Sequence, residues 1–291
     1  MRMSVNVSLI NSTRLTAFIA VFFLLTAVIS LPAQNAKWAQ WESEADTLLS
    51  RENFSGAIKL YTKIIKASKL KDKNSMGALY KRAVCYYSTG DHQRALKDLD
   101  VFVSMYPQVV QAHILRAFIY KDLHDNEHQL EALERVLALQ PSNPEVIKLR
   151  ASVYMEEEKY REAITDLLFV RTVKDDAETE VYLGYSYYSL QQIDSALIAL
   201  NRSIELNPSY LPAYLYAGSF CIEEGNYDLA LKYLAIASRL DPANTTVQFY
   251  KGIALIEKEN LDEGCSCLNK AFYGGEDDAA DYLKEYCYGS K

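Results

Sequence analysis

The chain has 291 residues, with 31 Lys and Arg against 38 Asp and Glu and a formal net charge of −7 at pH 7. This acidic balance, without a basic stripe at helical spacing, excludes nucleic acid as an expected partner because phosphate repels a negative surface. The longest basic cluster, Lys63 to Lys73, is interrupted by Asp72 and is interpreted as a solvated connection.

Residues 1–33 differ in composition from everything that follows. They contain two arginines and no acidic residue, and an apolar run extends over Leu15–Leu31. This pattern predicts a secretory signal peptide cleaved after Ala33, and the mature chain then has a net charge of about −9. The apolar run is also long enough to stay in place as a membrane anchor. We therefore expect an exported protein, which is periplasmic or in the cell envelope if the source is bacterial.

From residue 36 onward, small residues recur about every 34 positions in two columns. The first column contains Ala45, Ala83, Ala117, Ala151, Gly184, Gly218 and Gly252, and the second contains Ala57, Ala95, Ala163, Ala196, Ala230 and Gly264. Each period is interpreted as two helices whose backbones cross closely at the small residues. A larger side chain there would cost about 1–3 kcal/mol through overpacking.

The stretch Leu211–Asn244 shows one period most clearly. Over Tyr214–Cys221, small and apolar residues follow one another at i, i+3, i+4 and i+7, which is one face of a helix. Gly225-Asn226 then breaks the pattern. The second helix ends at Asp241-Pro242 because proline can neither donate to nor continue the preceding turn. The period is therefore predicted to be a helical hairpin.

This hairpin resembles the tetratricopeptide repeat family, whose sparse motif of large apolar and small residues followed by proline it matches with few substitutions. The motif falls here on Tyr214, Ala217, Gly218, Cys221, Ala230, Leu234, Ala237 and Pro242. Seven copies fit residues 36–276, near 38–75, 76–109, 110–143, 144–176, 177–210, 211–244 and 245–276, with a predicted capping helix at 279–288. The resemblance implies an all-α fold, a right-handed superhelical solenoid of about seven helix-turn-helix repeats.

One short motif points to other chemistry. The segment His124 to His128 has the H-x-x-E-H order of an inverted zinc-peptidase motif. Zinc binding by that motif requires both histidines on one continuous helix, whereas the repeat register places His124 in the turn between two helices. We interpret the segment as a polar turn. Because nucleotide-binding and hydrolase motifs are also missing from the sequence, we expect no catalytic residue, metal or cofactor, and therefore no enzyme.

In the second, third and fourth repeats, the same inward-facing position of the first helix is occupied by arginine: Arg82, Arg116 and Arg150. An unpaired buried charge is costly, so each arginine needs a partner. Sixteen residues after two of them, on the facing side of the second helix, stand Asp98 and Asp166. The spacing predicts structural ion pairs of Arg82 with Asp98 and of Arg150 with Asp166. Arg116 has an alanine at the matching position, and we expect it to reach Asp98 of the preceding repeat.

Five cysteines leave at least one thiol unpaired. Cys85 and Cys221 fall on first helices and are interpreted as small core residues. A disulfide from Cys265 or Cys267 to Cys287 would hold the last helix on the seventh repeat.

In a solenoid of helical hairpins the first helices line the inner curve, so the stripe opposite their packing face forms a groove. Its candidate partner-binding residues are Tyr80, Val84, Tyr87, Ile114, Phe118, Val181, Tyr185, Tyr188, Leu215, Phe249 and Ile253. The alternative role of the same residues is packing between neighbouring first helices.

The predicted groove indicates a binding surface, and its partner could be a protein segment or a glycan. A protein or peptide segment would bury apolar anchors on the aromatic side chains. It is favoured over a glycan because the stripe is poor in the Asn, Asp, Gln and Trp that sugar sites use. The Lys and Asn pattern with which related cytosolic chaperone-tail binders grip a carboxylate is not reproduced. We expect an exported scaffold or adaptor, with a glycan-associated cell-envelope protein and a self-associating assembly factor as alternatives. Membrane contact is expected only through an uncleaved N-terminal anchor.

Overall fold

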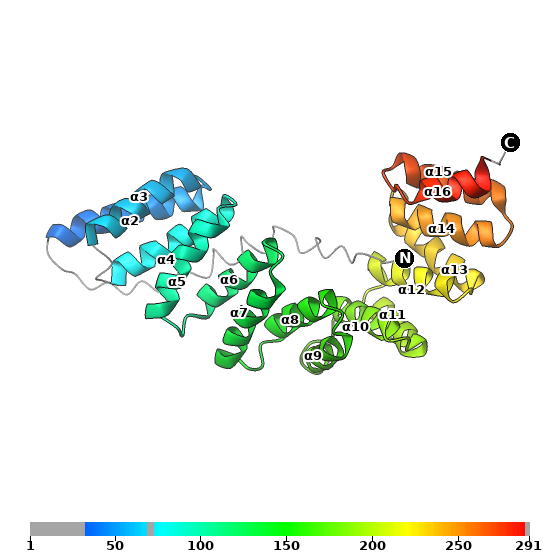
Figure 1. The fold of residues 1–291 in the computed structure, drawn as a ribbon, viewed down its shortest axis with the longest axis horizontal. Helices are drawn as coiled ribbons and strands as arrows, with labels where there is room; N and C mark the ends of the chain where they lie inside the picture. The colour runs from blue at the N-terminus through cyan, green and yellow to red at the C-terminus, as the bar shows by residue number, and fades with distance from the viewer. Residues whose placement is uncertain (1–32, 69–72, 289–291) are drawn as a thin grey trace. The chain divides into compact units, whose positions relative to one another are not determined.

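The computed structural model describes residues 33–68 and 73–288, and the regular structure in these ranges is helical, without a strand. The fold is all-α, as the repeat pattern predicts. Within each of the two units described below, consecutive helices pack against each other, and Figure 1 shows the resulting helical hairpins. The predicted signal peptide lies outside the described residues except for Ala33, the first residue of α2. Within the described ranges, no helix combines the length and the apolar character that crossing a membrane requires.

The chain divides into two compact units, Met1–Ser142 and Asn143–Lys291. In the first unit the helices are α2 (Ala33–Ser50), α3 (Phe54–Ser68), α4 (Lys73–Ser88), α5 (His92–Met105), α6 (Val110–Asp122) and α7 (Asn126–Leu139). In the second unit they are α8 (Pro144–Glu156), α9 (Tyr160–Val173), α10 (Ala177–Ser189), α11 (Ile193–Leu206), α12 (Leu211–Glu223), α13 (Tyr227–Leu240), α14 (Thr245–Glu257), α15 (Leu261–Tyr273), α16 (Ala279–Tyr282) and the π-helical turn η3 (Leu283–Cys287).

The small-residue columns lie where the two helices of a hairpin touch. A Cβ atom on Gly218 would stand 2.7 Å from Leu234 Cγ, well inside the roughly 3.5–4.0 Å of a normal carbon contact. Gly184 and Gly252 have the same relation to a leucine of their partner helices. The alanines of the second column are fully buried, at Ala57, Ala95, Ala163, Ala196 and Ala230. Close packing of the helices therefore accounts for both columns.

Each hairpin turn contains one residue with positive φ. Glycine supplies it at Gly90 (φ 76°) and Gly225 (φ 73°). The same turn position is occupied in the other hairpins by Glu52, His124, Glu158, Gln191 and Glu259. A left-handed residue after the helix lets the following amide reach a carbonyl of the last turn, as when the N–H of Asp91 donates to Tyr86 O at 2.8 Å. The left-handed conformation costs a non-glycine residue about 1 kcal/mol, which hairpin packing must offset.

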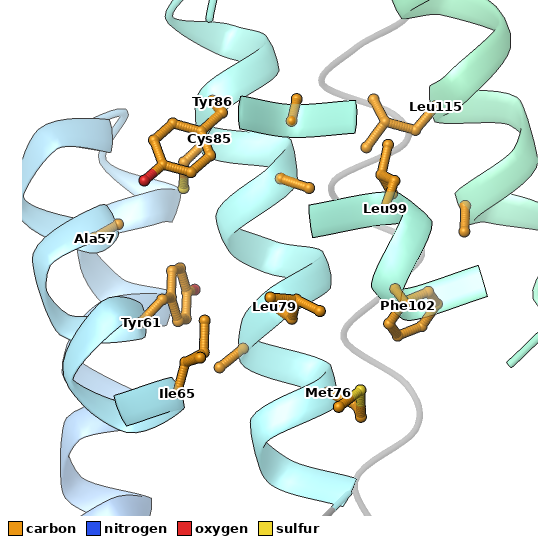
Figure 2. Packing of buried hydrophobic residues seen from close by; sticks show 14 of the residues in the cluster. Ala57, Tyr61, Ile65, Met76, Leu79, Cys85, Tyr86, Leu99, Phe102 and Leu115 are labelled. Atoms are coloured by element: carbon orange, nitrogen blue, oxygen red, sulfur yellow. The ribbon is translucent and has the colours of Figure 1, made fainter. Parts of the chain in front are cut away.

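The core of the first unit extends from α2 to α6, and Figure 2 shows part of its side chains. Tyr61 and Leu99 are completely enclosed, and the Tyr61 hydroxyl donates a hydrogen bond to Asp46 Oδ1 at 2.6 Å. Cys85 is buried in the same cluster as a free thiol. In the second unit Cys221 is likewise free and buried. Burial raises the pKa of the Cys85 thiol to about 12, so this thiol stays protonated at neutral pH.

The chain after α15 folds back onto the last hairpin. Ala279 and Leu283 are buried against a cluster that includes Phe249. Where the sequence predicts one helix over 279–288, the α-helix runs only to Tyr282 and a π-helical turn follows. A disulfide joins Cys265 to Cys287, whose Cα atoms are 5.7 Å apart. Of the two candidate cysteines on α15, the other points into the core and stays a free thiol.

Candidate functional site: a tyrosine face on the second unit

Two arginines at the inward position of the first helix pair with the aspartates sixteen residues later. Arg82 donates from Nε and Nη2 to both oxygens of Asp98 at 2.7 Å each. Arg150 donates in the same way to Asp166, at 2.8 and 2.7 Å. Burial works against the charge of Arg82, but the hydrogen bond and charge of Asp98 outweigh it, so the pKa of the guanidinium is raised. Both pairs tie the two helices of one hairpin together.

The third arginine has a different partner from the expected one. Arg116 Nη2 lies 3.4 Å from Oδ1 of Asp100, a side chain that is 60% exposed. Both oxygens of the expected partner, Asp98, already accept hydrogen bonds from Arg82. Arg116 therefore has the weaker, more solvated contact of the three.

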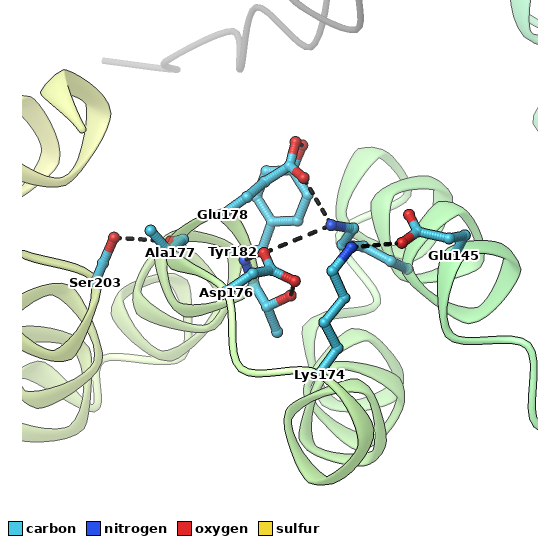
Figure 3. Close-up of polar contacts among 9 residues, drawn as sticks. Glu145, Lys174, Asp176, Ala177, Glu178, Tyr182 and Ser203 are labelled. Carbon is cyan, nitrogen blue, oxygen red and sulfur yellow. Dashed lines mark hydrogen bonds and ion pairs between the residues drawn. The ribbon is translucent and has the colours of Figure 1, made fainter. Parts of the chain in front are cut away.

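A polar cluster surrounds the start of α10, where Figure 3 shows Asp176, Glu178 and Tyr182 close together. The buried Lys148 of α8 donates to Glu178 Oε2 at 2.7 Å and lies 3.6 Å from Asp176. The Tyr182 hydroxyl donates to the other oxygen of Glu178 at 3.3 Å. Within this cluster a lysine ammonium therefore binds a carboxylate that also accepts a hydrogen bond from a tyrosine.

A buried carboxylate on α10 binds arginines of α9 and α11. Glu180 has 1% of its side chain exposed and accepts hydrogen bonds from Arg171 at 2.7 and 2.6 Å. Arg202 Nε approaches the same carboxylate at 3.3 Å. The Arg171 contact connects consecutive hairpins at the junction where the sequence has Asp175 in place of the proline found in other repeats, and the Arg202 contact lies within the hairpin of α10 and α11. We assign this group to structural support.

The predicted groove residues are less accessible than the sequence suggested, and none of them is exposed. Ile114, Val181, Phe249 and Ile253 are buried, while Tyr80, Val84, Tyr87, Phe118, Tyr185, Tyr188 and Leu215 are half-buried. In the first unit Tyr80 packs on Phe102, with ring centroids 5.2 Å apart. Many of these residues thus fill the space between neighbouring helices, the role that the sequence left open beside partner binding.

The predicted groove residues leave out three further tyrosines on the first helices of the second unit. Tyr182, Tyr216 and Tyr250 are half-buried and occupy the same position of α10, α12 and α14. Their exact spacing of 34 residues was the available signal, because a repeated side chain at one register position lines one surface. We call Tyr182, Tyr185, Tyr188, Tyr216 and Tyr250 together the tyrosine face.

Ring contacts join the tyrosine face between the first helices α10 and α12. Tyr185 meets Tyr216 edge-on with centroids 5.8 Å apart. Tyr188 stacks on Phe220 at 3.8 Å, and Phe220 in turn contacts Tyr216 at 5.8 Å. Consecutive first helices α10, α12 and α14 are in contact along this line. The rings of Tyr185, Tyr188 and Tyr216 are therefore held in place by aromatic neighbours, with part of each left accessible.

Carboxylates border the tyrosine face. The Tyr188 hydroxyl donates to Glu223 Oε2 at 3.0 Å, and Tyr250 lies within the electrostatic influence of Glu223 and Glu276. Burial is the main cause that raises the pKa of Tyr185 to about 12, and burial with these negative charges raises that of Tyr250 as well. The hydroxyls therefore remain protonated and can donate hydrogen bonds at neutral pH. The face offers aromatic surface, hydroxyl donors and acceptor carboxylates.

The histidines of the H-x-x-E-H segment do not share a helix. α6 ends at Asp122, His124 has the left-handed conformation of the turn, and α7 begins at Asn126. His128 instead contacts Asp125 through Nδ1, at 2.8 Å. Among residues 33–68 and 73–288, no three His, Cys, Asp or Glu side chains gather so as to hold a metal ion.

Comparison with known proteins identifies the repeat. A family model described as tetratricopeptide repeat matches residues 43–110, 183–244 and 222–264, more than half of the chain, and a second model of the same description matches 110–143. The chain is 29% identical over 143 residues to human tetratricopeptide repeat protein 13, covering 47% of this chain and 17% of that protein.

It is also 33% identical over 100 residues to the tetratricopeptide repeat and J domain-containing co-chaperone DNJ1 of Cryptococcus neoformans, covering 33% of this chain and 18% of that protein. The chain thus matches less than a fifth of the length of both relatives. A tetratricopeptide repeat protein from Parabacteroides merdae has a similar fold, with a TM-score of 0.68 at 14% identity, covering 85% of this chain and 97% of that one.

Proposed function

This chain belongs to the tetratricopeptide repeat family, and we propose that it is an exported, non-catalytic scaffold that binds a segment of a partner protein on its tyrosine face. The fold supports binding of protein or peptide partners, and proteins of this family are generally non-catalytic scaffolds. Export, the binding surface and the absence of catalysis in this chain are the parts that we propose.

The observation that carries the proposed binding site is the alignment of Tyr182, Tyr216 and Tyr250 on three consecutive first helices. Tyrosine offers a large apolar ring and a hydroxyl donor, a combination enriched at protein interfaces. Because the rings of Tyr185 and Phe220 already restrict Tyr216, this side chain has little conformational entropy left to lose on binding. A partner segment that lies across α10, α12 and α14 could contact all three rings.

The proposed export draws on two features. Residues 1–33 have the composition of a secretory signal. Cys265 and Cys287 form a disulfide, and structural disulfides persist mainly in oxidising compartments outside the cytosol. Mass spectrometry of the protein from its native source should find an N-terminus at Gln34 and an oxidised cysteine pair. A chain that retains Met1 and has reduced cysteines would refute export.

Binding on the tyrosine face can be tested with two matched variants. Tyr216→Ala with Tyr250→Ala removes two rings of the face, whereas Lys232→Ala changes an exposed side chain of α13. Partners captured from the native source are identified by mass spectrometry, purified and titrated against each variant. Loss of a central aromatic contact typically costs about 2 kcal/mol, so we expect at least about 30-fold weaker binding for the double tyrosine variant and no change for the control. Equal affinity in both variants would refute this binding surface.

A further inference from the structure

We infer that the partner segment bound on the tyrosine face is cationic, with Lys or Arg side chains placed among apolar residues. This inference rests on the proposed function and adds the chemical class of the partner. Three features carry it. They are the carboxylates that border the face, the contact of Lys148 with a carboxylate at its edge, and the affinity of tyrosine rings for cationic side chains.

Exposed carboxylates lie at the C-terminal ends of two of the three first helices that carry the face, α12 and α14. Glu223 is the last residue of α12 and accepts the hydrogen bond from Tyr188, and Glu257 is the last residue of α14. The unsatisfied carbonyls at a helix C-terminus add further negative potential at these ends. No ion pair formed by a described residue involves Glu223 or Glu257. These two charges are therefore available to a cation from outside the chain.

The chain itself contains one example of the proposed contact. At the edge of the face, Lys148 Nζ donates to Glu178, and the same carboxylate accepts a hydrogen bond from Tyr182. Along the face, Glu223 has a corresponding tyrosine donor, Tyr188, and no lysine. A Lys or Arg side chain of the partner that approached Glu223 would complete the same arrangement of cation, carboxylate and tyrosine.

Tyrosine rings add to this preference. The negative face of an aromatic ring attracts a cation, and the methylene stems of Lys and Arg pack on aromatic surface. The chain already shows such contacts, with the Arg94 guanidinium 4.6 Å from the centroid of the Tyr86 ring. A segment with alternating basic and apolar side chains would use both the rings and the bordering carboxylates.

Charge favours a cationic segment over the other possible occupants of the tyrosine face. An acidic segment would be repelled by the same carboxylates, and a second copy of this chain would bring a net charge of −7 to the contact. A cationic segment of a different protein gains attraction from both the local carboxylates and the chain as a whole.

The test begins with a random library of displayed 12-residue peptides selected on the full chain. The strongest peptide is then synthesised and titrated at low and high salt against three variants. The first is Glu223→Gln with Glu257→Gln, the second is Tyr216→Ala with Tyr250→Ala, and the third is Glu205→Gln, which changes an exposed glutamate on α11. Circular dichroism verifies that each variant keeps its helical content.

If the inference is right, the selected peptides are rich in Lys and Arg. Their affinity falls about 5-fold or more in the double glutamine variant and at high salt, and it is unchanged in Glu205→Gln. Neutral or acidic peptides that lose binding only in the double tyrosine variant would overturn the inference and leave the proposed function standing. Peptides that bind the double tyrosine variant as tightly as the wild type would overturn both. A dimer in light scattering that Tyr216→Ala abolishes would assign the face to a second copy and also overturn the inference.

Discussion

Replacing Asp98 by asparagine should destabilise the first unit strongly, because the change keeps the size of a buried side chain and removes its charge. Asp98 accepts two hydrogen bonds at 2.7 Å from Arg82, and its side chain is only 8% exposed. The asparagine amide can accept with one oxygen only and carries no compensating charge. Arg82 would then remain in a largely buried position without an ionic partner.

The size of the effect follows from the burial of the remaining arginine. Removing one partner of a buried ion pair costs about 3–5 kcal/mol. Arg82 keeps 15% of its side chain exposed and a hydrogen bond to Thr62 at 3.0 Å, so we reduce the expected loss to about 2–3 kcal/mol. The matched control is Asp100→Asn, because Asp100 is 60% exposed and 3.4 Å from its arginine. That change should cost less than about 0.5 kcal/mol.

Urea unfolding followed by far-ultraviolet circular dichroism would measure both variants. Repeat arrays can unfold in parts, so hydrogen exchange of amides in α4 and α5 should accompany the unfolding curves. Replacing both members of the pair by apolar residues, Arg82→Met with Asp98→Leu, should recover most of the lost stability, since no uncompensated charge then remains. If Asp98→Asn and Asp100→Asn were equally stable, the assignment of the pair to structural support would be wrong.

Three further changes test other parts of the fold. Gly218→Ala should cost about 1–3 kcal/mol in urea unfolding because the new Cβ atom would lie 2.7 Å from Leu234 Cγ, and unchanged stability would contradict the close helix crossing. Cys287→Ser opens a disulfide loop with a sequence separation of 22 and should lower stability by about 3 kcal/mol in non-reducing buffer, with no such difference from the wild type under reducing conditions. The hydrogen bond and charge of Asp125 raise the pKa of His128, so this contact stabilises the fold below a pH of about 6.5 and its contribution is lost as pH rises through the folded pKa. Nuclear magnetic resonance should show the His128 pKa falling toward 6.5 in Asp125→Asn, and an unchanged pKa would rule out the contact in solution.

The repeat period by itself determined the class of fold, the starts of five first helices and two ion pairs within hairpins. Five first helices begin at the residues where the sequence divides into repeats, at Val110, Pro144, Ala177, Leu211 and Thr245. The pairs Arg82–Asp98 and Arg150–Asp166 could be found from spacing, because sixteen residues connect facing positions across one turn. Small residues, helix-breaking residues and the spacing of paired charges reflect contacts within one repeat, so the sequence alone is enough to recognise them.

Contacts between hairpins depended on the tertiary structure. Arg116 meets Asp100, Arg171 meets Glu180, and Tyr188 reaches Glu223. The choice of Cys265 for the disulfide also required the structure, because its neighbour two residues later points into the core. Each of these contacts depends on how far one hairpin is rotated and shifted against the next. The sum of many side-chain packing contacts determines that rotation, and no single sequence position encodes it.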